Sequence, residues 1–194
     1  MNADQIAEAK TGILGGIGTE MVWKLRYPDF FHGHGKKRNF FEGWYFKLVN
    51  GVETSVFTII PGLTLGRSAK DNHSFIQLID GKKKKAVYIP YPASCFQAAG
   101  KRFSVCIEQN RFSLQSISLA VDNADFHVQG SLSLHHIVTW PDSFVNPGSM
   151  GFYNYLPFMQ CYSHVCAMNA DLEGMLAING REVDFSGGKG YVEK

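Results

Sequence analysis

One carboxylate lies within the most aromatic stretch of this 194-residue chain, Phe40-Phe41-Glu42-Gly43-Trp44-Tyr45-Phe46-Lys47. A carboxyl group among aromatic rings is costly to ionise unless it is paired, so we expect the pKa of Glu42 to be raised. A group of this kind could serve as a proton donor near neutral pH. The alternative is a rim glutamate paired with Lys47 or Arg38 beside a structural aromatic stripe, because structural ion pairs also perturb pKa values.

Further titratable and aromatic residues could complete a site with Glu42. With 15 Phe, 8 Tyr and 3 Trp, the chain suits an aromatic pocket that contains a few polar groups, as small-molecule sites do. The candidates are His73, His164, Asp184, Glu193, Tyr45, Tyr153, Tyr162 and Tyr191. We find no nucleophile elbow, phosphate-binding loop or dinucleotide fingerprint.

Two histidine pairs could contribute metal ligands. His32-x-His34 would place two imidazoles on one face of a strand, whereas the adjacent His135-His136 would not. Neither pair has a third ligand at a set spacing, so we expect surface or rim histidines and no metal site.

Composition limits the partners and the compartment. The net charge of +2 is too small to indicate a nucleic-acid-binding protein. The run Lys82–Lys85 follows Asp80-Gly81 and is interpreted as a solvated hairpin end, with a weak contact to an anionic membrane as the alternative. Met1–Lys10 lacks an apolar core, so no secretory signal is expected, and the four cysteines lack a CxxC pair. We therefore expect reduced thiols and a cytoplasmic protein, or one peripheral to a membrane; the oligomeric state stays open.

Turn residues predict the elements that must position these groups. Asn50-Gly51, Asp80-Gly81 and Asn179-Gly180 each separate β-rich segments, which is the strongest short signal for a hairpin. The strands expected at these hairpins are 44–49 with 54–60, 74–79 with 86–89, and 174–178 with 182–185. Further strands are expected at 102–108, 111–121 and 126–135. A change of phase within 111–121 indicates a β-bulge near Ser116.

The pattern predicts an all-β fold, an antiparallel barrel or strongly curved sheets with a short N-terminal helix near Ala3–Lys10. Residues 1–20 form the helix and a glycine-rich arm in this interpretation, and 21–194 form the β-domain. A second β-domain could begin near residue 140. Strand alternation would place Phe40, Glu42, Trp44 and Phe46 on one face, opposite Phe41, Tyr45 and Lys47.

The block from Phe40 to Lys47 resembles the opening signature of the tocopherol cyclase family. Further segments agree in order: Pro61-Gly62, His73–Gln77, Pro147–Tyr153, Pro157–Tyr162 and Asp184–Lys194. The resemblance implies tandem lipocalin-like β-domains and an intramolecular cyclase (an isomerase) that closes a chroman ring on a prenylated hydroquinone, with no redox or metal cofactor. Members of the family continue beyond the last segment. The chain is therefore expected to be an N-terminal portion, with an open sheet edge after Tyr191–Lys194.

Chroman closure needs an acid, a stabilised tertiary cation and exclusion of water. We expect Glu42 to donate the proton, and His73 or Glu193 to deprotonate the phenol. Trp44, Tyr45 and Tyr153 would line the cation site, with Tyr162 also binding substrate. The alternatives are a prenyl-lipid or carotenoid hydratase, which admits water to the same cation, and a non-catalytic binder of a hydrophobic ligand.

Overall fold

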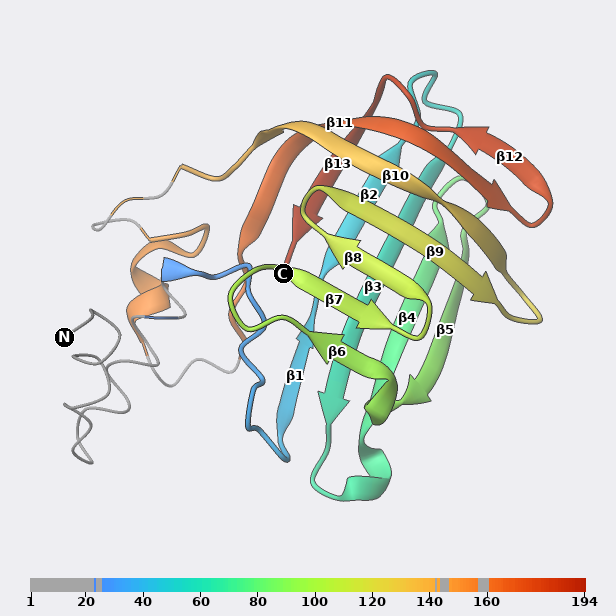
Figure 1. Cartoon of the computed structure of the whole chain (residues 1–194). Helices are drawn as coiled ribbons and strands as arrows, with labels where there is room; N and C mark the ends of the chain where they lie inside the picture. Colours follow the sequence, from blue (N-terminus) through green and yellow to red (C-terminus); the bar gives the residue numbers. More distant parts are fainter. Residues whose placement is uncertain (1–22, 24–25, 142, 144–146, 157–160) are drawn as a thin grey trace, which may run out of the picture.

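The computed structural model describes residues 23, 26–141, 143, 147–156 and 161–194, and within them the chain is built almost entirely of strands (Figure 1). No helix in these ranges is long and apolar enough to cross a bilayer. The expected helix near Ala3–Lys10 and the glycine-rich arm lie outside the described residues. The strands are β1 (Phe40–Gly43), β2 (Tyr45–Val49), β3 (Val56–Leu65), β4 (His73–Asp80), β5 (Lys85–Pro92), β6 (Phe96–Ala98), β7 (Ser104–Ile107), β8 (Asn110–Ser113), β9 (Ser116–Asp122), β10 (His127–Val138), β11 (Val165–Ile178), β12 (Arg181–Asp184) and β13 (Gly188–Glu193). Three short 3-10 turns are η1 (Ala69–Asp71), η2 (Ala93–Cys95) and η3 (Gly151–Tyr155).

All of these strands belong to one antiparallel sheet. Its order is β5-β4-β3-β2-β13-β11-β10-β9-β8-β7-β6, with β1 paired to β3 and β12 paired to β11. The sheet curls until β5 and β6 approach each other, which gives a nearly closed barrel of the lipocalin-like kind. The predicted all-β antiparallel fold is confirmed.

The three expected hairpins are present. Asn179 and Gly180 have φ values of 51° and 78°, and they join β11 to β12 in the two-residue turn that twisted strands favour. Asn50 closes the β2–β3 turn by accepting a hydrogen bond from the backbone N–H of Ser55 at 2.7 Å. Between β4 and β5, Lys82–Lys84 are exposed turn residues, as the hairpin interpretation expects.

The expected bulge near Ser116 is wrong. The change of phase comes instead from a tight turn at Leu114-Gln115 that separates β8 from β9. The hydroxyl of Ser113 closes this turn by accepting the backbone N–H of Ser116 at 2.9 Å. A turn and a bulge both shift the alternation by one residue, so the sequence pattern did not separate them.

The position of β13 corrects two further expectations. This strand lies between β11 and β2 and pairs with both, so it is an interior strand and not an open edge. The backbone of Lys194 continues the pairing, exchanging two hydrogen bonds of 2.8 Å with His164. Because β11, β12 and β13 join the same sheet as the earlier strands, the described residues after 140 form no second β-domain.

The inner face of the barrel is packed with apolar side chains. Trp44 stacks on Phe103 with ring centroids 5.1 Å apart, and Phe46 lies 6.0 Å from both Phe103 and Phe112. Trp44, Phe46 and Phe112 are each at most 1% exposed. The aromatic residues that suggested a ligand pocket therefore form a packed core over this part of the interior.

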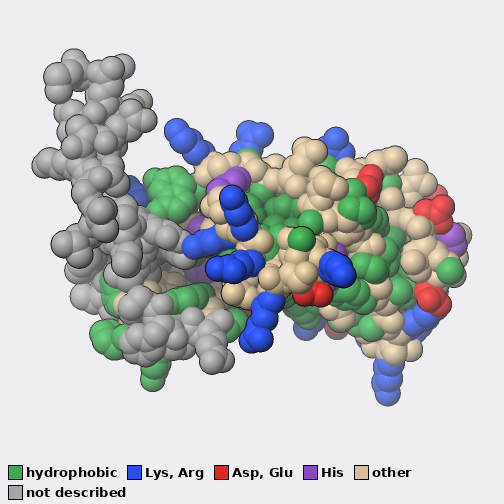
Figure 2. Space-filling model, turned by 90° about the horizontal axis from the view of Figure 1, so that it is seen from below, with side chains coloured by type: hydrophobic (Ala, Val, Ile, Leu, Met, Phe, Trp, Pro, Cys, Tyr) green, Lys and Arg blue, Asp and Glu red, His purple; other side chains and the backbone are tan. Residues whose placement is uncertain are grey.

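The lower end of the barrel in Figure 1 contains the start of β1 and the connection between β3 and β4. Figure 2 views the molecule from this side and shows Lys and Arg side chains gathered there.

Candidate functional site

Strands β1 and β2 alternate as the sequence predicted. Glu42, Trp44 and Phe46 point inward, and Phe41 and Lys47 point outward and are exposed. The two strands are separated at Trp44, whose backbone N–H donates to the carbonyl of Pro61 at 3.0 Å. Its indole N–H donates to the carbonyl of Asp29 at 3.0 Å, which fixes the ring at this end of the barrel.

The partner of Glu42 is Lys194. Its Nζ lies 2.6 Å from Oε1 of Glu42, and the two side chains are 7% and 10% exposed. The other carboxylate oxygen accepts the backbone N–H of His32 at 2.9 Å. The expected partners Lys47 and Arg38 are therefore wrong, although the expectation of an ion pair is confirmed.

Lys194 is held from several sides. Nζ donates to the carbonyl of Pro28 at 2.9 Å and also to the carbonyl of Phe30. It lies 3.0 Å from Nδ1 of His32 and 5.4 Å from the centre of the Trp44 ring. The ammonium is thus stabilised by a carboxylate, by backbone dipoles and by an aromatic face.

The ring nitrogens of His32 contact three neighbours. Nε2 lies 2.9 Å from the carbonyl oxygen of Tyr27, which can only accept, so Nε2 carries a proton. Nδ1 lies 3.0 Å from Nζ of Lys194. Oε1 of Glu42 is 3.3 Å from the same Nδ1. The three side chains form a compact group, which we call the charge cluster: His32, Glu42 and Lys194.

The pKa of Glu42 moves in the direction opposite to our expectation. Burial alone raises it, but the hydrogen bonds from His32 and the charge of Lys194 outweigh burial, and the net pKa is lowered. A carboxyl group with a lowered pKa is ionised at neutral pH and holds no proton to donate. Burial also lowers the pKa of Lys194, against the opposing effect of Glu42. The group in this cluster whose pKa moves toward neutrality is thus the lysine.

The segment Tyr27–His34 covers the charge cluster and this end of the barrel. Phe31 inserts its ring between Phe40, Trp44 and Phe96, with centroid distances of 5.8, 6.4 and 5.0 Å. The backbone of this segment supplies the carbonyl groups that bind Lys194. Packing and polar contacts together fix the segment over Trp44.

Tyr45 and Glu193 lie on the outer wall of the barrel. They are register partners on β2 and β13, and their chain neighbours Phe46 and Val192 are the fully buried inward residues. Glu193 accepts hydrogen bonds from Ser163 at 2.5 Å and from Tyr191 at 2.9 Å. Burial, and next the hydrogen bond to Glu193, raise the pKa of Tyr191 to about 12. These residues are not brought to Glu42.

His73, Tyr153 and Tyr162 are also separate from the charge cluster. His73 accepts from the Tyr88 hydroxyl at 2.6 Å and donates from Nδ1 to the Asp71 carbonyl at 2.9 Å, on the outer face of β4. Tyr153 and Tyr162 are 58% and 45% exposed, so neither lines the inner face. Of the predicted site residues, Trp44 alone lies with Glu42 at the charge cluster, whereas Tyr45, Tyr191 and Glu193 contact one another on the outer wall.

Lys194 and His32 were not predicted as partners of Glu42. A signal for Lys194 was present, because it follows Gly190 and Val192 in the two-residue alternation that points inward on β13. His32 lies in a connection without regular structure, where no periodicity predicts a direction. Its partner in the histidine motif, His34, is exposed beside the carbonyl of Ala99. Among the described residues, no group of three or more His, Cys, Asp or Glu side chains could hold a metal ion.

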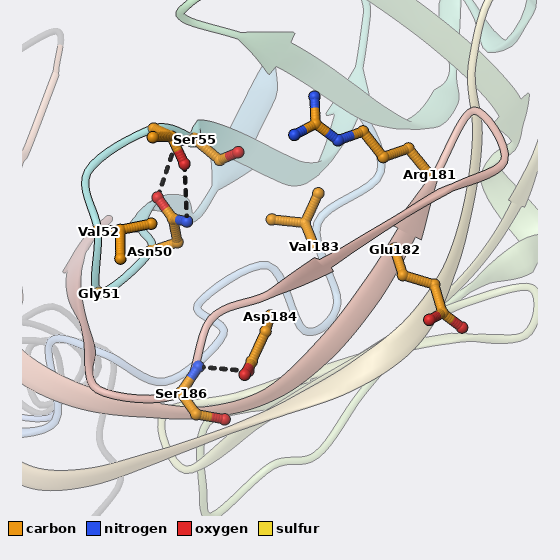
Figure 3. Close-up of a pocket in the computed structure, with 10 residues that line it drawn as sticks. Asn50, Gly51, Val52, Ser55, Arg181, Glu182, Val183, Asp184 and Ser186 are labelled. Atoms are coloured by element: carbon orange, nitrogen blue, oxygen red, sulfur yellow. Dashed lines mark hydrogen bonds between the residues drawn. The ribbon is translucent and has the colours of Figure 1, made fainter.

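Two cavities lie away from the charge cluster. One of about 240 Å³ lies between the β2–β3 turn and β12. Figure 3 shows that its polar side chains hold the turns themselves: Asn50 binds Ser55, and Asp184 accepts the backbone N–H of Ser186 at 2.8 Å. A second, of about 700 Å³, is lined by residues of β5, β8, β9, β10 and β11 and of the β7–β8 turn, among them Tyr91, Glu108 and His127. Neither cavity is lined by a predicted site residue apart from Asp184.

Comparison with known proteins identifies no family. None of the protein-family models matches the chain. No curated protein matches it. Among solved structures, the crystal structure of CghA with Sch210972 is similar over 79% of this chain and 44% of that chain, with a TM-score of 0.46 and 15% identity. The chain thus spans less than half the length of that structure, and a likeness of this size says nothing about chemistry.

Proposed function

We propose that this chain closes a chroman ring on a prenylated hydroquinone, as its resemblance to the tocopherol cyclase family implies. In this proposal Lys194 donates the proton to the alkene and later accepts the phenolic proton. The observation that supports this proposal is the buried Lys194–Glu42 ion pair against the face of Trp44. It combines, within one cluster, a proton donor, a fixed negative charge and an aromatic ring.

The proposed step is an isomerisation. The ammonium of Lys194 gives a proton to one alkene carbon, the π electrons form the new C–H bond, and a positive charge develops on the neighbouring tertiary carbon. The phenol oxygen then donates an electron pair to that carbon, and the phenolic proton passes to the neutral amine of Lys194. No atoms are gained or lost, and the enzyme returns to its starting state.

Glu42 has a different role in this mechanism from the one we expected. Its ionised carboxylate balances the charge of the ammonium before proton transfer and the charge of the carbocation afterwards. The Trp44 face stabilises the same cation by about 0.5–2 kcal/mol. A positive charge thus remains beside a fixed carboxylate and a ring throughout the reaction.

Substrate entry requires movement of the segment Tyr27–His34. The carbonyl groups of Pro28 and Phe30 bind the ammonium that must reach the alkene, and Phe31 covers Trp44. A prenyl chain packed in place of Phe31 would keep water from the cation, which favours cyclisation over hydration.

The test is incubation of the full chain with a trimethylhydroquinone that bears a prenyl chain, in D₂O, followed by chromatography and mass spectrometry. We expect a chroman that is isomeric with the substrate except for one deuterium in place of hydrogen, bound to the ring carbon adjacent to the carbon that bonds the oxygen. Lys194→Met should abolish the product, whereas Lys47→Met, an exposed lysine on β2, should retain it. Equal turnover by Lys194→Met and wild type would remove Lys194 from the proposed role.

A non-catalytic binder is the second candidate. The observation that favours it is the number of acceptors around Nζ of Lys194, since hydrogen bonds to these groups direct the ammonium protons away from a substrate. Recovery of the prenyl-quinol bound and unchanged would support the binder, and a product heavier by one water would support the hydratase.

A further inference from the structure

The connection before β1, residues 33–39, contacts two other connections. They are residues 66–72 between β3 and β4, at the lower end of the barrel in Figure 1, and residues 99–103 between β6 and β7. The backbone N–H of Asn39 donates to the carbonyl of Gly66 at 3.1 Å, which joins the first two. The side chain of His34 lies 3.5 Å from the carbonyl of Ala99, which joins the first and the third.

These connections are strongly basic. We call their seven exposed cations the basic rim: Lys36, Lys37, Arg38, Arg67, Lys70, Lys101 and Arg102. Their only carboxylate is Asp71, which accepts the backbone N–H of Ser68 at 3.3 Å. Seven cations and one carboxylate give a formal charge of +6, against +2 for the whole chain, so the remainder has −4. The small net charge therefore conceals a polarised molecule.

An exposed aromatic wall begins next to the basic rim. Phe41, three residues after Arg38, is 66% exposed and stacks on Phe75 at a centroid distance of 5.9 Å. Phe75 stacks in turn on Tyr88 at 5.0 Å. A Cβ atom at Gly62 would lie 2.4 Å from the Phe75 ring, so a glycine there is what lets the ring lie against the sheet.

We propose that the basic rim and Phe41 dock this end of the barrel onto an anionic phospholipid surface. The cations would lie at the level of the phosphate groups, where each contributes separately to binding, and Phe41 would enter the acyl boundary. The arrangement fits such an interface, because the exposed ring follows the cations 36–38 directly along the chain, so that both can reach one surface.

A nucleic acid is the competing partner for a basic surface. Single strands are bound where aromatic rings lie between cations along a groove, so that bases stack as phosphates are neutralised. Here the exposed ring of Phe41 follows the cations 36–38 along the chain and stacks on Phe75, so it does not alternate with them. The geometry therefore favours the lipid surface.

The chain provides a matched control at the other end of β4. Lys82, Lys83 and Lys84 are also exposed, but carboxylates are close by: Lys83 pairs with Asp80 at 3.2 Å, and the adjacent Lys85 pairs with Asp125 at 3.4 Å. Replacing these three lysines by Gln changes the net charge as much as replacing Lys37, Arg38 and Arg67 by Gln. All six side chains are exposed, so both triple variants should fold.

The experiment is co-flotation of the full chain with vesicles of phosphatidylcholine, with and without phosphatidylserine at about three parts in ten. We expect binding only to the mixed vesicles and a loss of binding at high salt. The Lys37, Arg38 and Arg67 variant should bind about tenfold to a hundredfold more weakly. The Lys82, Lys83 and Lys84 variant should bind within about twofold of wild type, and Phe41→Ser should weaken binding without removing its salt dependence.

Three outcomes would overturn the proposal. They are equal binding to both vesicle types, equal losses in the two triple variants, and binding of a single-stranded oligonucleotide without binding of the vesicles. None of these results depends on the chemistry of Lys194, so the docking surface and the proposed cyclase activity can fail independently.

Discussion

Nζ of Lys194 lies 2.6 Å from Oε1 of Glu42, at the end of the barrel that Phe31 and Trp44 occupy. The two residues come from distant parts of the chain and meet because β13 pairs with β2. This pair decides the protonation of the one carboxylate in the aromatic block, and most of the predictions below depend on it.

Removal of Lys194 should destabilise the fold. Lys194→Met leaves Glu42 buried without its cation, which typically costs about 3 kcal/mol or more. Urea denaturation measures the change in the free energy of unfolding. Lys47→Met is the matched control and should stay within about 0.5 kcal/mol of wild type, since the side chain is exposed. The double variant Glu42→Gln, Lys194→Met should recover part of the loss; strictly additive effects would show that the pair is not coupled.

Lowering the pH should weaken the Lys194–Glu42 ion pair and so reduce the free energy of unfolding. The folded pKa of Glu42 lies below its ordinary value of 4.5, so its stabilising contribution is fully present above that pH and is lost as the pH falls through the folded pKa. Between about pH 5 and about pH 3, wild type should therefore lose more stability than Glu42→Gln. Unfolding free energies measured across this range test the prediction, and parallel curves would contradict it.

At alkaline pH, the titration of Lys194 should increase the free energy of unfolding, whereas acid decreases it through Glu42. The folded pKa of Lys194 is lowered from 10.5 by burial, so the cost of the buried charge is present below the folded pKa and is relieved as the pH rises toward 10.5. Lys194→Met lacks this contribution. The difference in unfolding free energy between wild type and the variant should widen over this range, and a constant difference would argue against it.

Two phenylalanines ten residues apart in the sequence should behave differently. Phe31 is 7% exposed and packs on three rings, so Phe31→Ala should cost about 3 kcal/mol and open the barrel end to a hydrophobic dye. Phe41→Ala, at an exposed position, should change stability by less than about 1 kcal/mol. Similar losses in the two variants would show that Phe31 does not close the barrel.

The cysteines should react in order of burial. Burial raises the pKa of Cys166 to about 12, and Cys161 is exposed. Iodoacetamide should therefore modify Cys161 in the native protein and Cys166 only after unfolding, because the thiolate is the reactive form. Peptide mass mapping over time checks this order, and early modification of Cys166 would mean that the barrel opens near β11.

Much of the fold could be predicted because local rules determine it. The Asn-Gly and Asp-Gly turns placed three hairpins, and alternation placed Glu42, Trp44 and Phe46 on one face. The same alternation could not distinguish a turn from a bulge at Ser113–Ser116, since both shift the phase by one residue. It also could not show whether inward rings line a pocket or fill a core, because this depends on the rings opposite them.

The sequence by itself determined an antiparallel all-β chain with one carboxylate facing inward among aromatic rings. Only the tertiary structure decided what that carboxylate meets. The pairing of β13 with β2 brings Lys194 to Glu42, and the segment Tyr27–His34 brings His32. Burial among rings raises the pKa of a carboxyl group, whereas an adjacent cation and hydrogen-bond donors lower it. The direction of the shift therefore depends on residues remote in the sequence, which no local pattern identifies.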